Sequence, residues 1–161
     1  MEKVAKFEFV SKKQFDEDRK HITADPAELK LPVRATAGSA GYDIKSPFDI
    51  KLAPGETLRI PTGLRCRIKQ GWVMFIMPKS GLGFKFRVQL DNTVGVVDQD
   101  YYGADTEGHI LVQITNDSKS GKTMEIPAGK AFAQAVFLPY GITEDDEAEG
   151  ERTGGFGSTN S

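Results

Sequence analysis

Short runs of alternating apolar and polar residues recur along this chain, and they restrict its fold more than any other feature. Between residues 64 and 68, leucine, cysteine and isoleucine alternate with two arginines, and a glycine stands close to each end of the run. Similar runs occupy residues 5–9, 48–52, 110–114 and 133–137. A period of two is that of a half-buried β-strand, and no long stretch has the 3.6-residue period of a helix. We therefore predict an all-β domain, either an antiparallel barrel or a jelly-roll sandwich.

The bulk properties of the chain exclude several classes of protein. With 161 residues, 39% of them hydrophobic, the chain can bury the core of one globular domain. Its net charge of −2 argues against a general polyanion-binding surface, so we expect no stable nucleic-acid partner. The single cysteine, Cys66, excludes an internal disulfide and is expected to face the core. No apolar run has the length of a signal segment or a membrane span, which predicts a cytoplasmic protein without a membrane partner.

Residues 92–103 combine several chemically useful groups in one strand-like run. The run holds the Asn92 amide, Gly95, the carboxylates Asp98 and Asp100, and two adjacent tyrosines. A glycine in a strand indicates that another group approaches the backbone closely. Valines around Gly95 would anchor the run in the core, and a carboxylate on rigid β structure can orient a water molecule or bind a sugar hydroxyl. The residues alone leave open the alternative of a hairpin with a solvated end.

This run resembles the third motif of the homotrimeric dUTPases, enzymes that split dUTP into dUMP and pyrophosphate. Other segments resemble the remaining four motifs of the family in the same order, at residues 37–43, 78–83, 129–134 and 154–159. Each glycine-containing motif is weak evidence by itself, whereas five in order are strong evidence. The resemblance implies a distorted jelly-roll β-barrel with one short helix and a flexible C-terminal arm. It also implies a homotrimer with shared active sites.

The resemblance divides the chain into a barrel domain, residues 1–142, and an arm, residues 143–161, which opens with an acidic block. The family's short helix is expected near residues 80–86, with a strand from residue 88 onward, although alternation through this region reads as strand throughout. Two segments are longer than in compact members of the family. Residues 13–30 are expected to form a charged surface excursion, and residues 104–108 an insertion beside the catalytic run.

Two segments are expected to bind the phosphates. Lys79, Ser80 and Gly81 offer a cation, a hydroxyl and backbone amides, although the residues alone are more typical of an ordinary turn. The family usually has arginine where Lys79 stands, and lysine lacks the planar fork that binds two phosphate oxygens. In the arm, the resemblance assigns substrate contacts to Arg152, Phe156, Gly157, Ser158 and Thr159. Without the resemblance, this glycine-rich segment would be interpreted as a flexible terminus.

The resemblance places the uracil and the deoxyribose against residues 92–101. The Asn92 amide and backbone groups around Gly95 and Val97 would read the base, which would reject cytosine because donors and acceptors would be mismatched. Tyr101 is at the position that packs under the deoxyribose and blocks a 2′-hydroxyl. Taken alone, this tyrosine is more typical of a core or interface residue.

The resemblance makes Asp98 the carboxylate that orients a water molecule for attack on the α-phosphorus. Mg²⁺ would bridge the phosphate oxygens and keep most of its water. Asp43 and Gln134 match positions that act on metal-bound waters, and Gln134 also belongs to the substrate site. Both histidines, His21 and His109, fall outside every motif and are expected at the surface.

Two other functions are open on the sequence. A dCTP deaminase has the same fold, but no segment matches its general-base glutamate. A nucleotide-responsive regulatory protein is an alternative of another class, in which residues 13–30 and 104–108 would contact a partner. Ammonia release from dCTP would identify the first, and partner capture by a catalytically inactive Asp98→Asn variant would identify the second.

Overall fold

The computed structural model describes residues 1–150, 152 and 154 of the chain, and its elements are mainly strands. The helices are α1 (Lys12–Asp18), α2 (Ser80–Phe86) and the 3₁₀ helix η1 (Gln99–Gly103). The strands are β1 (Ala5–Phe9), β2 (Val33–Arg34), β3 (Tyr42–Lys45), β4 (Ile50–Leu52), β5 (Thr57–Pro61), β6 (Leu64–Ile68), β7 (Trp72–Pro78), β8 (Val88–Leu90), β9 (Gly95–Val97), β10 (Leu111–Asn116), β11 (Met124–Ile126) and β12 (Ala131–Pro139). None of the helices in this part of the chain has the length and apolar character that a membrane span requires.

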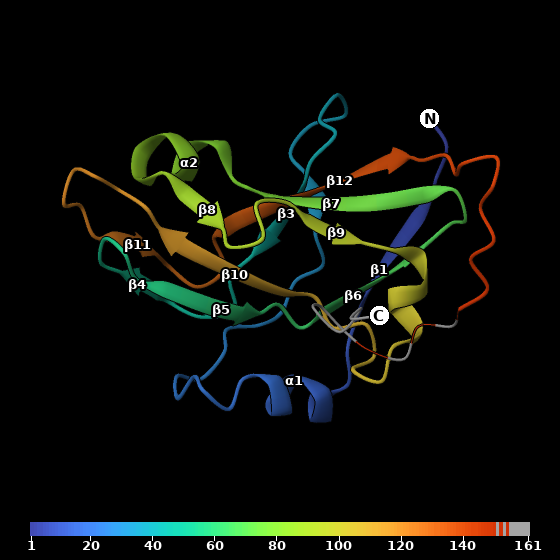
Figure 1. The fold of residues 1–161 in the computed structure, drawn as a ribbon. Coiled ribbons are helices and arrows are strands. Elements are labelled where there is room, and N and C mark those ends of the chain that lie inside the picture. Colours follow the sequence, from blue (N-terminus) through green and yellow to red (C-terminus); the bar gives the residue numbers. More distant parts are fainter. Residues whose placement is uncertain (151, 153, 155–161) are drawn as a thin grey trace.

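The strands form two layers around one core, which confirms the predicted jelly-roll architecture (Figure 1). A five-stranded antiparallel sheet has the order β2-β3-β12-β7-β9, and a three-stranded sheet has the order β5-β10-β8. The two-stranded pairs β11-β4 and β1-β6 complete the barrel. The long strand β7 joins the two ends of the molecule, with α2 near one end and η1 near the other (Figure 1).

The alternation in the sequence corresponds to alternate burial in the strands. In β6, Leu64, Cys66 and Ile68 are buried, while Arg67 between them is exposed. Burial raises the pKa of the Cys66 thiol to about 12, so this cysteine behaves as an apolar core residue, as predicted. Each large apolar side chain buried in this way contributes about 1.5–3 kcal/mol to stability.

Residues 80–90, where the resemblance and the alternation gave different predictions, contain both a helix and a strand. Residues 80–86 form α2, and β8 begins at Val88, which confirms the predicted boundary. Arg87 separates the two elements with a left-handed backbone, φ 48°, which ends the helix and turns the chain into the strand.

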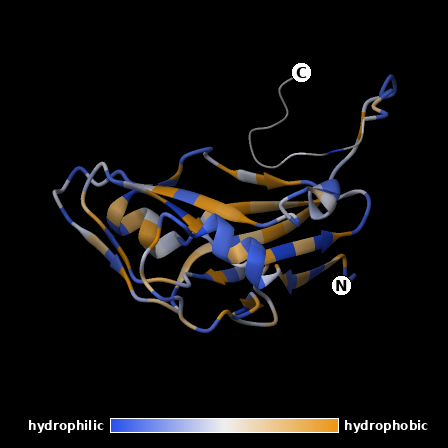
Figure 2. Ribbon diagram, turned by 90° about the horizontal axis from the view of Figure 1, so that it is seen from below, coloured by the Kyte–Doolittle hydropathy of each residue, from blue (hydrophilic) through white to orange (hydrophobic). Residues whose placement is uncertain are grey.

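The prediction of a single short helix is wrong, because α1 overlaps the start of residues 13–30, the segment expected to form a surface excursion. Ser11 caps the helix by accepting a hydrogen bond at Oγ from the backbone N–H of Gln14, at 3.1 Å. Phe15 is buried and stacks on Phe48, with 6.2 Å between the ring centroids. Figure 2 shows α1 as a mostly hydrophilic helix lying over more hydrophobic strands. Seven residues are too few for a recognisable helical period, so the sequence pattern did not reveal this helix.

The expectation that His109 lies at the surface is also wrong. Its side chain is completely buried beneath α1, whereas His21 is exposed as expected. Burial lowers the pKa of His109 below its ordinary value of 6.5, although hydrogen bonding to Asp18 opposes this shift. The imidazole is therefore neutral in the folded protein at neutral pH.

This burial predicts that acid destabilises the fold through His109. Because the pKa is lower in the folded than in the unfolded chain, the unfolded chain binds the additional proton once the pH falls below about 6.5. The free energy of unfolding should then decrease by up to about 1.4 kcal/mol per pH unit until the folded-state pKa is reached. Denaturant titrations over this pH range should detect the slope, which His109→Gln should remove and His21→Gln should leave unchanged. An identical slope in wild type and His109→Gln would contradict the assignment.

Candidate active site

Predicted site residues lie in three places along β7 and its neighbours. One group surrounds the C-terminal end of β7, a second lines a cavity beside the middle of the strand, and a third follows β9 at the opposite end. All three groups therefore depend on the same five-stranded sheet for their relative positions.

At the C-terminal end of β7, a lysine and an aspartate form an ion pair. Lys79 follows β7 directly and precedes α2, and Asp43 lies on β3. Lys79 Nζ is 2.7 Å from Asp43 Oδ1, and both side chains are partly buried. The sheet register brings them together, because Asp43 is opposite Gln134 on β12 and Gln134 is opposite Met77 on β7. Because both side chains are only partly buried, a cation and a carboxylate remain accessible together at this end of β7.

Gln134 belongs to the same group. Its Nε2 donates a hydrogen bond to the backbone carbonyl of Pro78, at 3.1 Å. Gly41 makes room for this side chain, because a Cβ at that position would lie 2.6 Å from Gln134 Oε1. Ser80 and Gly81 lie exposed at the start of α2, beside Lys79. Residues from three of the sequence motifs thus meet at one place, and together they offer oxygen ligands and a positive charge.

A cavity of about 430 Å³ lies between β7 and β9 of the five-stranded sheet and the strands of the three-stranded sheet. This volume is in the range of small-molecule sites. Asn92 and Gly95, both predicted to bind the base, line it. The other lining residues are Arg59, Ile76, Leu90, Asp91, Leu111, Val112 and Gln113. The floor is therefore apolar and the rim polar, which suits a flat heterocycle with polar edges.

The group that approaches Gly95 is a neighbouring side chain. A Cβ on Gly95 would lie 3.1 Å from the Cβ of Ile76 on β7, so a larger residue would press against the paired strand. Val97, two residues later, is buried in the core and does not line the cavity. A nucleotide in the cavity could therefore meet Val97 only through its backbone.

Tyr101 is buried within η1, away from the cavity lining. Its hydroxyl donates a hydrogen bond to the backbone carbonyl of His109, at 2.6 Å. Burial raises the pKa of Tyr101, so the phenol stays protonated and remains a donor. The ring is thus held firmly in place.

Asp98 stands between β9 and η1, with its side chain about half exposed. Its Oδ2 is 2.8 Å from Nη2 of Arg152, and Nε of the same guanidinium is 3.2 Å from Oδ1 of Asp100. Arg152 also lies over the ring of Tyr101, 5.7 Å from its centroid. The residue predicted to meet a phosphate therefore bridges two carboxylates of its own chain, one of them the predicted catalytic residue.

The two charged groups are far apart within one chain. Val97 pairs with Met74 on β7, so Asp98 lies beside the strand six residues before Lys79. At the rise of a β-strand, this corresponds to roughly 20 Å. In Figure 1, α2 and the turn that follows β9 lie at opposite ends of β7. The Lys79 ammonium is held by Asp43 on β3, whereas β9 lies on the other side of β7, so the Asp98 carboxylate and the Lys79 ammonium of one chain are well separated.

Some site residues were not predicted, and others lie beyond the described part of the chain. Arg59 at the cavity rim and the pair of Asp18 and His109 behind Tyr101 were missed. Phe15, Ile22 and Leu29 all pack in or against a second apolar cluster, but only Phe15 lies in α1, so their spacing does not reveal the helix. Phe156, Gly157, Ser158 and Thr159 lie outside the described residues.

Comparisons with known proteins agree on one family. The dUTPase family model matches residues 27–160. The deoxyuridine 5'-triphosphate nucleotidohydrolase of Lactococcus lactis is 40% identical over 136 residues, covering 83% of this chain and 89% of the relative. The crystal structure of dUTPase from Streptococcus mutans superposes with a TM-score of 0.67 at 31% identity, covering 86% of this chain and 98% of that one. A dUTPase mutant from phage phi11 of S. aureus, whose structure shows coordination of a structural Mg(II) ion, has a TM-score of 0.66 at 21% identity and covers 92% of this chain and 98% of that one.

Proposed function

This chain belongs to the dUTPase family, and from that membership we propose how its residues carry out the family's reaction. The enzyme is a dUTP diphosphatase, which hydrolyses dUTP to dUMP and pyrophosphate. This reaction limits the incorporation of uracil into DNA and supplies dUMP for thymidylate synthesis. The family membership favours this activity over the deamination of dCTP and over a purely regulatory role.

The proposed active site is shared between subunits of a homotrimer. The observation that carries this proposal is the separation of Asp98 from Lys79 by roughly 20 Å along β7. Each site then takes Lys79 and its neighbours from one subunit and Asp98 with the base cavity from another. A closed ring of three chains would contain three such sites, related by symmetry.

The uracil ring enters the cavity beside Asn92 and Gly95 in this proposal. The Asn92 amide carries both a donor and an acceptor, so it can pair with the edge of uracil, whereas cytosine would leave buried groups unpaired. Tyr101 supports the deoxyribose from its fixed position in η1. Val97 contributes through its backbone, since its side chain is buried in the core.

Asp98 orients a water molecule and accepts its proton as the water oxygen bonds to the α-phosphorus. The bond from the α-phosphorus to the bridging oxygen breaks, and pyrophosphate leaves with the electron pair. Lys79 compensates the negative charge that develops on the phosphates, and Ser80 and Gly81 supply hydrogen-bond donors beside it. For Arg152 to join them, it must leave the carboxylates of Asp98 and Asp100, to which it is bound in the structure.

Asp43 and Gln134 fit an indirect role towards Mg²⁺. Asp43 is paired with Lys79, and Gln134 is bonded to the carbonyl of the preceding Pro78. Each side chain carries an oxygen atom, and Mg²⁺ prefers oxygen ligands and retains several waters. Within residues 1–150, no three His, Cys, Asp or Glu side chains group closely enough to hold a metal ion alone. When bound, the ion would neutralise phosphate charge, with Asp43 and Gln134 holding its water ligands. The structural Mg(II) ion of the phage phi11 relative is consistent with use of this metal in the fold.

The proposal divides the chain into the barrel, residues 1–142, and a C-terminal arm, residues 143–161. Phe156 would stack on the base, which contributes on the order of 1–3 kcal/mol in comparable contacts. Gly157, Ser158 and Thr159 would donate hydrogen bonds to the phosphates. A cytoplasmic location completes the proposal, supported by a lone, buried cysteine that suits a reducing compartment.

An assay of pyrophosphate release across four nucleotides tests the proposed function. We expect rapid release from dUTP with Mg²⁺, and at least a hundredfold lower kcat/KM for UTP, dCTP and dTTP. UTP carries a 2′-hydroxyl that clashes, cytosine has mismatched hydrogen-bonding groups, and thymine carries an additional methyl group. Excess EDTA should abolish turnover, and added Mg²⁺ should restore it. Ammonia release from dCTP, measured in parallel, would instead indicate a deaminase, and activity unchanged by EDTA would contradict the role of the metal.

A further inference from the structure

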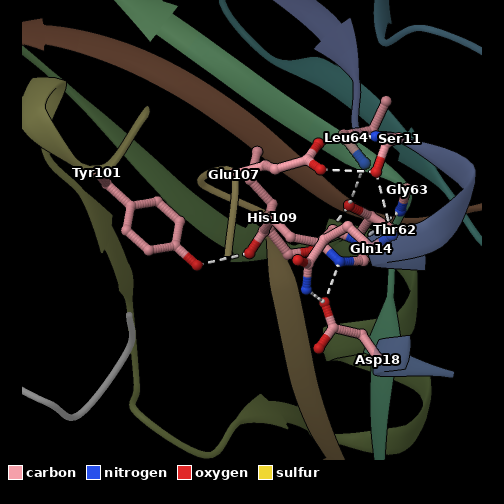
Figure 3. A network of polar contacts seen from close by, with 10 residues as sticks. Ser11, Gln14, Asp18, Thr62, Gly63, Leu64, Tyr101, Glu107 and His109 are labelled. Carbon is pink, nitrogen blue, oxygen red and sulfur yellow. Dashed lines mark hydrogen bonds and ion pairs between the residues drawn. The ribbon is translucent and has the colours of Figure 1, made fainter. Parts of the chain in front are cut away.

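Helix α1 and the loop of residues 104–109 pack on each other behind η1, and the dUTPase reaction proposed above makes no use of either segment. Glu107 accepts hydrogen bonds from the backbone N–H and the Oγ of Ser11, the N-cap of α1, at 2.8 and 2.6 Å (Figure 3). Hydrogen bonding to Ser11 lowers the pKa of Glu107, so its carboxylate is charged at neutral pH. The loop thus fixes the beginning of the helix.

The end of α1 is fixed by His109. Its Nδ1 lies 2.5 Å from Oδ2 of Asp18, the last residue of the helix. Its Nε2 accepts a hydrogen bond from the backbone N–H of Gly63, at 2.9 Å. Because an amide can only donate, the proton must be on Nδ1, where it is donated to Asp18. The imidazole is therefore held from both sides, and Gln14 holds the Asp18 carboxylate in turn by donating to the same oxygen at 2.8 Å.

The backbone of His109 in turn holds η1. The Tyr101 hydroxyl points at the His109 carbonyl and donates to it across 2.6 Å (Figure 3). Gly108, with φ +67°, packs so tightly that a Cβ would lie 2.6 Å from the carbonyl oxygen of Tyr101. Within η1 itself, the bond from Tyr101 N–H to the Asp98 carbonyl is long, at 3.3 Å. A single 3₁₀ turn is weakly held by its own hydrogen bonds, so these outside contacts determine its position.

We propose that Asp18 and His109 are positioning residues for the active site, through which α1 fixes Tyr101 and the turn that begins at Asp98. The proposal rests on the proposed function, because its consequence is selectivity for deoxyribose. A tyrosine that supports the sugar discriminates against a 2′-hydroxyl only while it cannot move away. The two longer segments of this chain therefore form one structural unit that serves the catalytic run.

Asp18→Ala is the direct test, because it removes the carboxylate that orients His109. We expect the ratio of kcat/KM for dUTP to that for UTP to fall about tenfold, mainly through a lower KM for UTP and a higher KM for dUTP. Asp18→Asn should stay near wild type, since the amide oxygen can still accept the proton from Nδ1. Asp16→Ala is the matched control on the same helix. Asp16 forms ion pairs with Lys12 and Arg19, whereas the carboxylate that binds His109 is that of Asp18.

Tyr101→Phe keeps the test valid if Asp18→Ala does not fold. This substitution removes only the hydroxyl that reaches His109 and should lower the same selectivity ratio. In the double variant, Asp18→Ala should cause little further loss, because the contact that links it to η1 is already absent. A folded Asp18→Ala protein with the wild-type ratio, or an unchanged ratio in Tyr101→Phe, would overturn the proposal. Absence of dUTP hydrolysis in the wild type would instead refute the proposed function.

Discussion

Asp98→Asn is expected to reduce kcat for dUTP by roughly 10²–10⁴, the contribution of a general base in comparable enzymes. Asparagine has the shape of aspartate but cannot accept the proton of the attacking water at neutral pH. The affinity for dUTP should change only a few-fold, because the base cavity lies elsewhere on the sheet. Pyrophosphate release measures the first quantity, and calorimetric titration of the slow variant with dUTP measures the second.

Asp105→Asn is the matched control for this experiment. It makes the same chemical change at an exposed position seven residues away, within the insertion. The control should retain wild-type turnover. If Asp98→Asn lost affinity while each bound nucleotide still reacted at the wild-type rate, Asp98 would be a binding residue and the proposed mechanism would be wrong.

Mixing two inactive variants should restore activity if sites are shared between subunits. Asp98→Asn chains keep Lys79, and Lys79→Ala chains keep Asp98, so some sites in mixed trimers combine both intact residues. For random mixing at equal amounts, about one quarter of the sites should be complete, and activity should rise from background to about a quarter of wild type. The roughly 20 Å between the two residues within one chain is the physical reason for this expectation.

The control mixture combines Asp98→Asn with the double variant Asp98→Asn, Lys79→Ala. No arrangement of these chains supplies Asp98, so the activity should stay at background. Co-refolding of differently tagged chains gives both mixtures. Isolation of the doubly tagged oligomer removes the unmixed trimers, and about one third of the sites in that fraction should be complete. If the first mixture recovers nothing although mixed oligomers form, each site is built within one chain.

Selectivity and stability should respond differently to the two parts of the buried network. The charge state of His109 affects the free energy of unfolding, because its pKa is lowered by burial in the folded chain. Its carbonyl, which does not titrate, holds Tyr101. Tyr101→Phe should therefore change nucleotide selectivity without removing the pH dependence of stability, which separates the two roles of one residue.

The alternation of apolar and polar residues predicted neither of the two α-helices. The boundary between α2 and β8 was predicted correctly only because of the resemblance, since alternation from Phe84 to Leu90 favoured a strand throughout. No comparable guide existed for α1, whose seven residues are too short for a periodic signal. Without that helix, the burial of His109 could not be anticipated, because nothing was predicted to cover it.

The sequence by itself determined the β architecture, the strands with clear alternation such as β1, β6 and β12, and the chemical types at the candidate site. These features are local, because the period of two assigns each residue of a strand to the core or to solvent. Only the tertiary structure decided which groups meet: Lys79 with Asp43, Arg152 with Asp98, and His109 with Asp18. Such pairs join residues 36, 54 and 91 positions apart, and strand register and packing, which no local pattern encodes, determine their distances.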